Sequence, residues 1–273
     1  MTLAIDPTLE SLAIGFVTGV LSGAFGVGGG IFCTPVLRLL LNLPAHVAVG
    51  TTMALIIPTS IVGSVNYLKQ QLVDSELVKL LAIPAVLATI LGAMATSLMN
   101  GPLLMILFAL MVALAGADLT FNIGKKVVLE KEKTEPTHGG TQKLVVNKRT
   151  AIILGFVVGF MAGFFGVGGG FILVPCLLYF FNVSVKAAFG TSLLVIAIVS
   201  LPATITHAMA GHVNFPLALL MVGGAMPGSW LGSFLALKLK DSYLRRGFGI
   251  IMLFVAVILA TRELHSIQFG HGE

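Results

Sequence analysis

The chain has 273 residues, of which 57% are hydrophobic and 10% charged, and its mean hydropathy is +1.03. Soluble domains carry about 25% charged residues, so this composition excludes an ordinary soluble protein and indicates a polytopic membrane protein. The net charge of +5 does not indicate nucleic-acid binding, because the basic residues do not gather on one amphipathic or aromatic face; positive loops that stay in the cytoplasm explain it better.

The cysteines and the N-terminus exclude further classes. Cys33 and Cys176 lie inside apolar segments and form no Cys-x-x-Cys pair, so neither a zinc site nor a disulfide framework is indicated. Asp6 and Glu10 precede Arg38, the first basic residue. A cleavable signal peptide, which needs a positive N-terminal region, is therefore not expected. We predict no metal and no cofactor.

The first expected element, at about residues 10–41, is too long for one ordinary span. The run GVGGG at 26–30 interrupts it. Glycine in a helix interior costs about 1 kcal/mol relative to alanine, so this run predicts a break between two helical arms. The second arm, of about 12 residues, is short for a full crossing at 1.5 Å per residue. Three spans should follow, at about 45–68, 76–98 and 102–122.

A polar stretch at about 123–149 comes next. Its basic residues outnumber its acidic ones, and Pro136 and Gly139-Gly140 break it further. We interpret it as a flexible cytoplasmic linker between a first repeat, residues 1–122, and a second, residues 150–273.

The second half repeats the first in one constant register, without a gap through the motif. Residues 15–35 and 155–175 are identical at more than half of their positions, and the register continues from Gly-Thr-Thr at 50–52 to Gly-Thr-Ser at 190–192. The second set of segments is a hairpin at about 150–181 and spans at about 185–210, 215–237 and 243–262. Duplicated bundles are common among transporters.

The distribution of basic residues predicts the topology. If each glycine-broken segment returns to the side it entered from, each half has three crossings and the halves are inverted. All of the 16 basic residues except Arg38 and Arg262 then fall on one side, which we take as cytoplasmic. We therefore expect an all-α, multi-pass protein of the cell membrane, built from two inverted repeats, each a re-entrant hairpin plus three transmembrane helices, with a cytoplasmic linker and both termini outside.

Both copies carry spaced glycines, the run GVGGG, a following proline, and then an asparagine and Gly-Thr-Thr or Gly-Thr-Ser. This paired motif resembles the TauE/SafE family of permeases, also called the sulfite exporter or TSUP family. The resemblance covers nearly the whole chain apart from the linker. It implies transport of sulfur-containing anions or other small organic anions. The second copy departs at Ser184 and Lys186, where the first has Pro44 and His46, and these differences should tune loop geometry.

The glycine runs are the expected substrate site. Non-helical backbone at membrane depth survives only where protein buries it or water reaches it, so both runs should face a cavity. The short arm after each run would point its free N–H groups and positive dipole end there, which favours an anion. Alternatively, the glycines only permit tight helix contact, the role we expect for Gly15, Gly19 and Gly23 and their counterparts. The predicted substrate-binding residues are Gly26, Gly28, Gly29, Gly30, Thr51, Thr52, Gly166, Gly168, Gly169, Gly170, Thr191 and Ser192.

Other polar residues are open to two interpretations. The hydroxyls of Thr51 and its counterparts could donate to an oxyanion or bond back to their own helix. Arg38 either attracts anions or snorkels to lipid headgroups. Asn42 and Asn182 are expected to cap the helix that follows each hairpin.

These features predict a permease, a secondary transporter of a small anion, by resemblance a sulfur oxyanion or organosulfonate. A passive anion channel would share all of them. An intramembrane enzyme would need a catalytic pair that the sequence lacks, so we expect no enzymatic activity. The expected partners are the anionic substrate and the bilayer, with no nucleic acid, and a homo-oligomer stays open.

Overall fold

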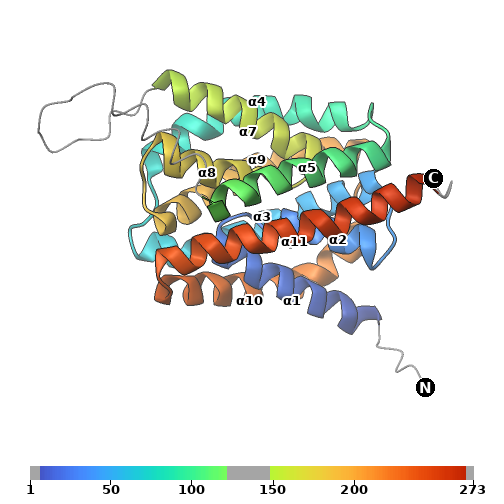
Figure 1. The fold of residues 1–273 in the computed structure, drawn as a ribbon, viewed down its shortest axis with the longest axis horizontal. Helices are drawn as coiled ribbons and strands as arrows, with labels where there is room; N and C mark the ends of the chain where they lie inside the picture. The colour runs from blue at the N-terminus through green and yellow to red at the C-terminus, as the bar shows by residue number, and fades with distance from the viewer. Residues whose placement is uncertain (1–6, 122–147, 269–273) are drawn as a thin grey trace, which may run out of the picture.

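The computed structural model describes residues 7–121 and 148–268, and within these ranges all regular elements are helices (Figure 1). The helices are α1 (Pro7–Phe25), α2 (Gly30–Leu39), α3 (Ala45–Lys69), α4 (Ser75–Thr96), α5 (Gly101–Phe121), α7 (Lys148–Phe165), α8 (Gly170–Phe180), α9 (Val185–Met209), α10 (Phe215–Lys238) and α11 (Asp241–Gln268). Their order follows the expected segments. The predicted linker lies outside the described residues, except that Lys148 and Arg149 begin α7.

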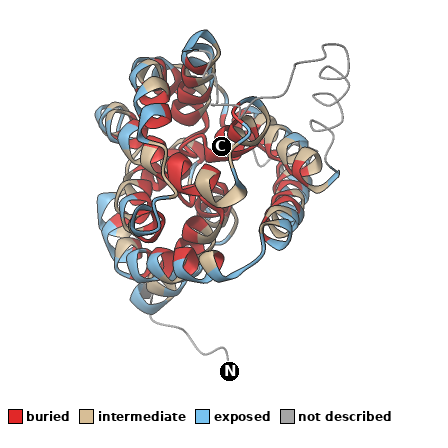
Figure 2. Ribbon diagram, turned by 90° about the vertical axis from the view of Figure 1, so that its left-hand side faces the viewer, coloured by how far each residue is buried: buried red, intermediate tan, exposed pale blue. Residues whose placement is uncertain are grey.

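Eight of these helices are long and apolar enough to cross a membrane, whereas α2 and α8 are shorter. Figure 2 shows buried residues turned toward the interior of the bundle and exposed residues on its outer face. That outer face carries large apolar side chains such as Leu91, Leu114 and Phe254. An apolar surface on this scale fits lipid rather than water.

Several helices begin at side-chain caps. Asp74 accepts from the backbone N–H groups of Glu76 and Leu77 at the start of α4, and Ser184 accepts from Ala187 at the start of α9. The capping role expected of Asn42 and Asn182 is wrong, because Pro44 and Ser184 occupy the N-cap positions. The two asparagines instead take φ angles of 50° and 47°, a left-handed conformation that asparagine tolerates in a turn.

Spaced glycines let α1 pack directly on α10. A β-carbon placed on Gly15, Gly19 or Gly23 would lie 2.2, 2.3 or 2.0 Å from a backbone carbonyl oxygen of α10. Gly155, Gly159 and Gly163 bring α7 equally close to α4. These glycines therefore have the packing role expected from their spacing.

The contacts fix helix directions in the first half. Gly15 meets Met221 and Gly23 meets Ser229, so α1 and α10 run the same way. The central helix α3 also runs with α10: the Thr51 hydroxyl accepts from the Asn214 N–H at 2.9 Å, and Asn66 donates to the Ser233 hydroxyl at 2.8 Å. Both α1 and α3 thus begin at the same end of α10, so α2 returns to the end from which α1 started.

The second half behaves likewise. Gly155 meets Leu81 and Gly163 meets Thr89, so α7 runs with α4. The Thr191 hydroxyl accepts from the Asp74 N–H at 3.1 Å, which places the start of α9 beside the start of α4. Hence α8 also leads back to the end from which α7 started.

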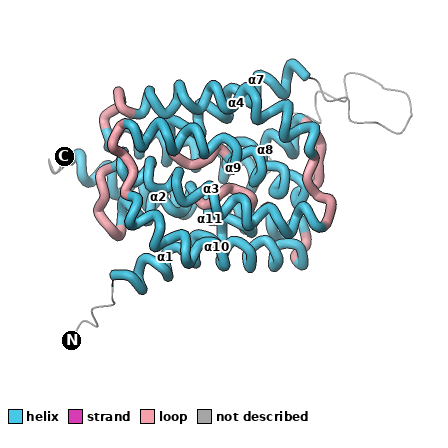
Figure 3. Tube along the Cα trace, turned by 180° about the vertical axis from the view of Figure 1, so that it is seen from behind, coloured by secondary structure: helices cyan, strands magenta, loops and turns pink. Residues whose placement is uncertain are grey.

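The bundle therefore has two distinct ends, visible from both sides in Figures 1 and 3. We call the end where α1 begins and α11 finishes the terminal end, and the end where α5 finishes and α7 begins the linker end. Lys69, Lys186 and Lys238 lie at the linker end, and Arg38 and Arg262 at the terminal end. These directions support the inverted-repeat organisation, which stays a prediction, as does the side of the membrane that each end faces.

Candidate functional site

Both glycine runs are sharp turns between helices. Gly26, Gly28 and Gly29 have φ angles of 70°, 72° and 91°, and Gly166, Gly168 and Gly169 have 66°, 75° and 75°. Residues with a β-carbon rarely adopt such angles, so glycine is required for the chain to reverse here. The break predicted between the two arms of each hairpin is confirmed.

The two turns meet inside the bundle. A β-carbon on Gly30 would lie 2.4 Å from the Cα of Val167, and one on Gly170 would lie 2.7 Å from the Cα of Val27. The backbones therefore touch with no side chain between them, so the two turns are in direct contact. The N-terminal ends of α2 and α8 lie at this junction, so their N–H groups without intrahelical partners converge on it.

Each turn also packs on the central helix of the other half. A β-carbon on Gly26 would lie 2.4 Å from the Cα of Phe189, and one on Gly166 would lie 2.8 Å from the Cα of Val49. The residues that follow Phe189 and Val49 are the Gly-Thr-Ser and Gly-Thr-Thr segments. The structure thus forms two equivalent places in which the turn of one half lies beside the hydroxyl-bearing segment of the other.

The hydroxyls predicted to bind substrate differ in their hydrogen bonds. The Oγ1 atoms of Thr51 and Thr191 hold the loops before α10 and α4 by accepting from Asn214 and Asp74. The Thr34 hydroxyl donates to Thr52 at 3.2 Å. The Oγ of Ser192 is buried without a hydrogen-bond partner. The first three oxygens position neighbouring loops and helices, whereas Ser192 retains full capacity for a ligand.

Sequence reasoning missed three further serines. The Oγ atoms of Ser22, Ser60 and Ser200 are buried and have no hydrogen-bond partner. Ser60 Oγ lies 2.9 Å from where a β-carbon of Gly28 would sit, and Ser22 Oγ lies 3.5 Å from that position at Gly29. A buried hydroxyl without a partner is unusual and asks for an explanation. Ser60 and Ser200 occupy equivalent positions in the two repeats, so the repeat itself was a signal that could have found them.

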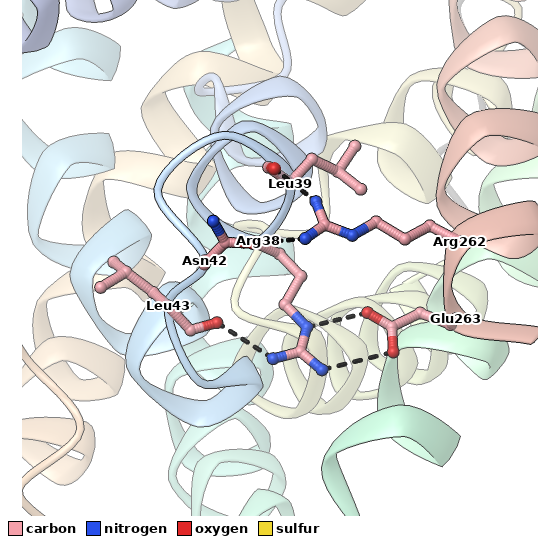
Figure 4. A network of polar contacts seen from close by, with 6 residues as sticks. All are labelled: Arg38, Leu39, Asn42, Leu43, Arg262 and Glu263. Atoms are coloured by element: carbon pink, nitrogen blue, oxygen red, sulfur yellow. Dashed lines mark hydrogen bonds and ion pairs between the residues drawn. The ribbon is translucent and has the colours of Figure 1, made fainter. Parts of the chain in front are cut away.

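Arg38 is tied to α11 rather than directed at the turns (Figure 4). Its Nε donates to Oε1 of Glu263 at 2.8 Å and its Nη2 to Oε2 at 3.3 Å, while Nη1 donates to the Leu43 carbonyl at 3.1 Å. Arg262 donates in turn to the Leu39 carbonyl and to Asn42 Oδ1. Because the Glu263 carboxylate is buried and balances the Arg38 charge, we do not carry Arg38 into the candidate site.

A basic pocket opens at the linker end, with a volume of about 490 Å³. Its lining is Asn66, Lys69, Gln70, Leu72, Lys186, Phe234, Leu237 and Lys238, which includes three lysines, and the Asp241 carboxylate lies 3.9 Å from Lys186 Nζ beside it. Lys186 Nζ donates to the Leu237 carbonyl at 2.9 Å, and Lys238 lies 4.3 Å from the ring centre of Phe234. The positive potential of such a pocket attracts small anions.

The charge at the junction comes from helix ends. Within the described residues no group of three or more His, Cys, Asp or Glu side chains is placed to hold a metal ion. The N-terminal end of a helix carries roughly half a positive charge, and two such ends face one junction here. This geometry can hold an anion without a buried lysine or arginine at the junction.

The chain is similar to known membrane proteins over most of its length. The family model described as "Sulfite exporter TauE/SafE" matches residues 11–259. YunE of Bacillus subtilis, named a probable membrane transporter protein, is 26% identical and the match covers 95% of this chain and 98% of that protein. A probable membrane transporter protein of Xylella fastidiosa (strain Temecula1) is 27% identical over 97% of this chain and 99% of its own length. No solved structure matches the chain.

The match spans both hairpins and the helices around them, and the relatives are named as transporters rather than enzymes. The chain is a multi-pass membrane protein and belongs to the sulfite exporter TauE/SafE family of membrane transporters.

Proposed function

We propose that the protein is a secondary transporter that moves a small anion, a sulfur oxyanion or organosulfonate, and binds it where the two glycine turns meet. The observation that carries this proposal is the convergence of two helix N-termini on one buried junction flanked by hydroxyls without partners. Helix N-termini and free hydroxyls together make a neutral cage that binds an anion weakly enough to release it. The family name supports a sulfur-containing substrate.

The lysines at the linker end support entry of the anion from that end. The lysine-lined pocket at the linker end would concentrate anions from the side that we take as the cytoplasm. The termini would then lie outside. The lysine-lined pocket attracts the anion, whereas the junction has no charged side chain of its own. A fixed positive charge at the junction would hold the anion too tightly for release.

The packing of the junction favours a transporter over a passive channel. Ile56 and Ile196 are fully buried at the centre of α3 and α9 and contact the glycine turns. Buried side chains and touching backbones fill the path that an open pore would need. Passage therefore requires the hairpins and central helices to move, as in alternating access.

The test is transport by the purified protein in liposomes. Liposomes preloaded with unlabelled sulfite should accumulate labelled sulfite transiently, because a carrier exchanges substrate across the membrane. Taurine and short carboxylates would rank the substrate class. Single-channel currents, or flux that never saturates, would overturn the transporter assignment in favour of a channel. Absence of flux for every anion in the panel would overturn the assignment altogether.

A further inference from the structure

Three histidines gather at the terminal end. His46 lies at the start of α3, His207 near the end of α9, and His212 in the loop between α9 and α10. The ring centres of His46 and His212 are 5.2 Å apart, and those of His207 and His212 are 5.8 Å apart. His207 is fully buried and the other two are partly exposed. The cluster therefore joins the protein interior to the terminal end.

Hydrogen bonds fix the protonation pattern of two of these rings. His207 Nε2 lies 3.0 Å from the Gly163 carbonyl oxygen, and His46 Nε2 lies 3.0 Å from the Met99 carbonyl oxygen. A carbonyl only accepts, so in each ring Nε2 carries the hydrogen and Nδ1 of the neutral form is a proton acceptor. The Nδ1 atoms of His207 and His212 are buried without hydrogen-bond partners. The cluster thus has unused basic nitrogen atoms inside the protein.

The counterparts of these histidines in the other repeat lie at the linker end, and two of them make equivalent hydrogen bonds without an imidazole. Tyr67 is the counterpart of His207 in the first repeat, and its hydroxyl donates to the Gly23 carbonyl at 3.0 Å, as His207 does to Gly163. Lys186 stands where the first half has His46, and it also donates to a carbonyl at the end of a neighbouring helix. Leu72 takes the place of His212. Hydrogen bonding alone therefore does not require histidine, since tyrosine and lysine satisfy the same carbonyls.

The cluster contacts residues that lie next to the candidate anion site along the chain. His207 holds the carbonyl of Gly163, which lies in the last turn of α7 before the second glycine turn. The carbonyl oxygen of His212 lies 2.3 Å from where a β-carbon of Gly50 would sit, and Thr51 follows Gly50. A charge placed on these rings would act on the second turn and on the Gly-Thr-Thr segment that packs beside it.

We propose that this histidine cluster binds a proton and that the bound proton raises the affinity of the adjacent turn for the anion, so that the protein is a proton-coupled anion transporter. This inference rests on the proposed function. The pocket at the linker end owes its charge to lysines, which stay protonated at any physiological pH, whereas the histidine cluster at the terminal end is charged only when a histidine binds a proton. The anion would then bind or leave beside the cluster together with the proton.

The surroundings of the cluster agree with this role. The carbonyls of Thr96 at the end of α4, of Met99 in the loop after it and of Gly163 in α7 face the rings. The charged groups that act on His207 and His212 among the described residues are the other histidines of the cluster. Burial, and then the neighbouring His46, lower the pKa of His212 in its loop. His212 is therefore neutral near pH 7, and it is protonated at a lower pH than an ordinary histidine.

The experiment uses the full chain in liposomes with thiosulfate and methanesulfonate, whose charge does not change between about pH 5 and pH 8, the range in which histidine titrates. We expect the half-saturating concentration to fall about fivefold or more from the alkaline to the acidic limit, a typical size for coupling between two sites. A pH-sensitive dye inside the vesicles should report proton movement when either anion is added.

Two variants and a control make the test specific. His207→Tyr keeps a donor for the Gly163 carbonyl, as Tyr67 does for Gly23, but removes the basic nitrogen; His212→Gln removes a loop imidazole and serves if the first variant does not fold. Both should flatten the pH dependence and abolish proton movement. His265→Gln, at the same end on α11, should change neither. Anion transport that is independent of pH in the unmodified protein, or pH dependence retained by the variants, would overturn the coupling and leave the transporter assignment standing. Failure to move either anion at any pH would instead count against both.

Discussion

The two hairpins have the same backbone conformation at their turns, but the side chains around the turns differ. Gly29 and Gly169 are equivalent left-handed residues, and each lies beside a backbone carbonyl, that of Thr18 or of Val158. The side chains differ: Ser22 lies beside Gly29, whereas Ala162 and the Val158 side chain lie beside Gly169. A β-carbon on Gly29 would meet its nearest atom at 3.3 Å, and one on Gly169 would be pressed against Val158 at 2.8 Å. Duplication has kept the geometry that only glycine can supply and has let the side chains around it diverge. The first turn is the more polar and roomier place for a ligand.

The tethers of the hairpins differ as well. The short arm α2 is joined to α11 by the ion pair between Arg38 and Glu263, and the short arm α8 is joined to the same helix by a bond of 2.7 Å from Arg245 to the Tyr179 hydroxyl. Both arms thus attach to α11, one at each end of the bundle. The charged tether is the more buried, so the first hairpin should be held more firmly.

The largest effect is expected when both turns are changed together. Gly29→Leu with Gly169→Leu places bulky side chains on two residues with positive φ, where they would be strained and would push α1 and α7 away from the turns. We expect complete loss of transport and of substrate binding by the purified protein. A folded double variant that still binds and transports the anion at unchanged rates would place the site elsewhere.

Breaking the tethers should rank next. Glu263→Gln leaves the Arg38 guanidinium without its carboxylate in a largely buried place, and we expect a loss of about 3 kcal/mol in the free energy of unfolding. Tyr179→Phe removes a partly exposed hydroxyl that binds both Arg245 and Asp118, and it should cost about 1–2 kcal/mol. Thermal unfolding in detergent compares the two. Equal losses would show that the hairpins are held alike.

Alanine substitutions at the turns should separate the cost of steric overlap from the cost of a left-handed backbone. Gly29→Ala should cost about 1–2 kcal/mol, because its main penalty is the left-handed backbone. Gly169→Ala carries the same penalty and adds overlap with Val158, for a further loss of about 1–3 kcal/mol. Unfolding curves for the two proteins give the difference directly. A reversed order would mean that the first turn is the tighter one in solution.

Composition and repetition were enough to predict most of the fold, because apolar runs and a glycine interruption have few solutions in a bilayer. The break at Gly26–Gly30 followed from glycine's helix propensity, and its partner followed from the repeat. The site was harder to predict, since it depends on which helices cross. Thr51 and Thr191 follow the helix segments that pack on the turns, but their oxygens accept from loops that are distant along the chain. The repeat could have singled out Ser60 and Ser200, whereas Glu263 and Ser22 became visible only when the packing placed them beside Arg38 and Gly29.

The subtlest prediction concerns the serine hydroxyls. Ser60→Ala removes an oxygen that makes no hydrogen bond within the protein, so the free energy of unfolding should stay the same or rise slightly. If that oxygen binds the anion, the half-saturating concentration should rise about fivefold, since one hydrogen bond contributes about 1 kcal/mol. The opposite signs of the two effects distinguish a binding hydroxyl from a structural one.

Two comparisons sharpen this result. Thr120→Val, on α5 away from the turns, removes a hydroxyl that donates to the Gly116 carbonyl of its own helix at 2.7 Å, and it should lower stability with little effect on substrate affinity. Ser200→Ala is the equivalent change in the second half. Ser22 adds a second hydroxyl near the first turn, whereas Ala162 takes its place near the second, so the anion should lie nearer the first turn. Ser200→Ala should therefore weaken binding less than Ser60→Ala. Equal effects at Ser60 and Ser200 would mean that the anion lies midway between the turns. No effect at either would show that these hydroxyls do not touch it, and the polar lining of the first hairpin would then need another explanation.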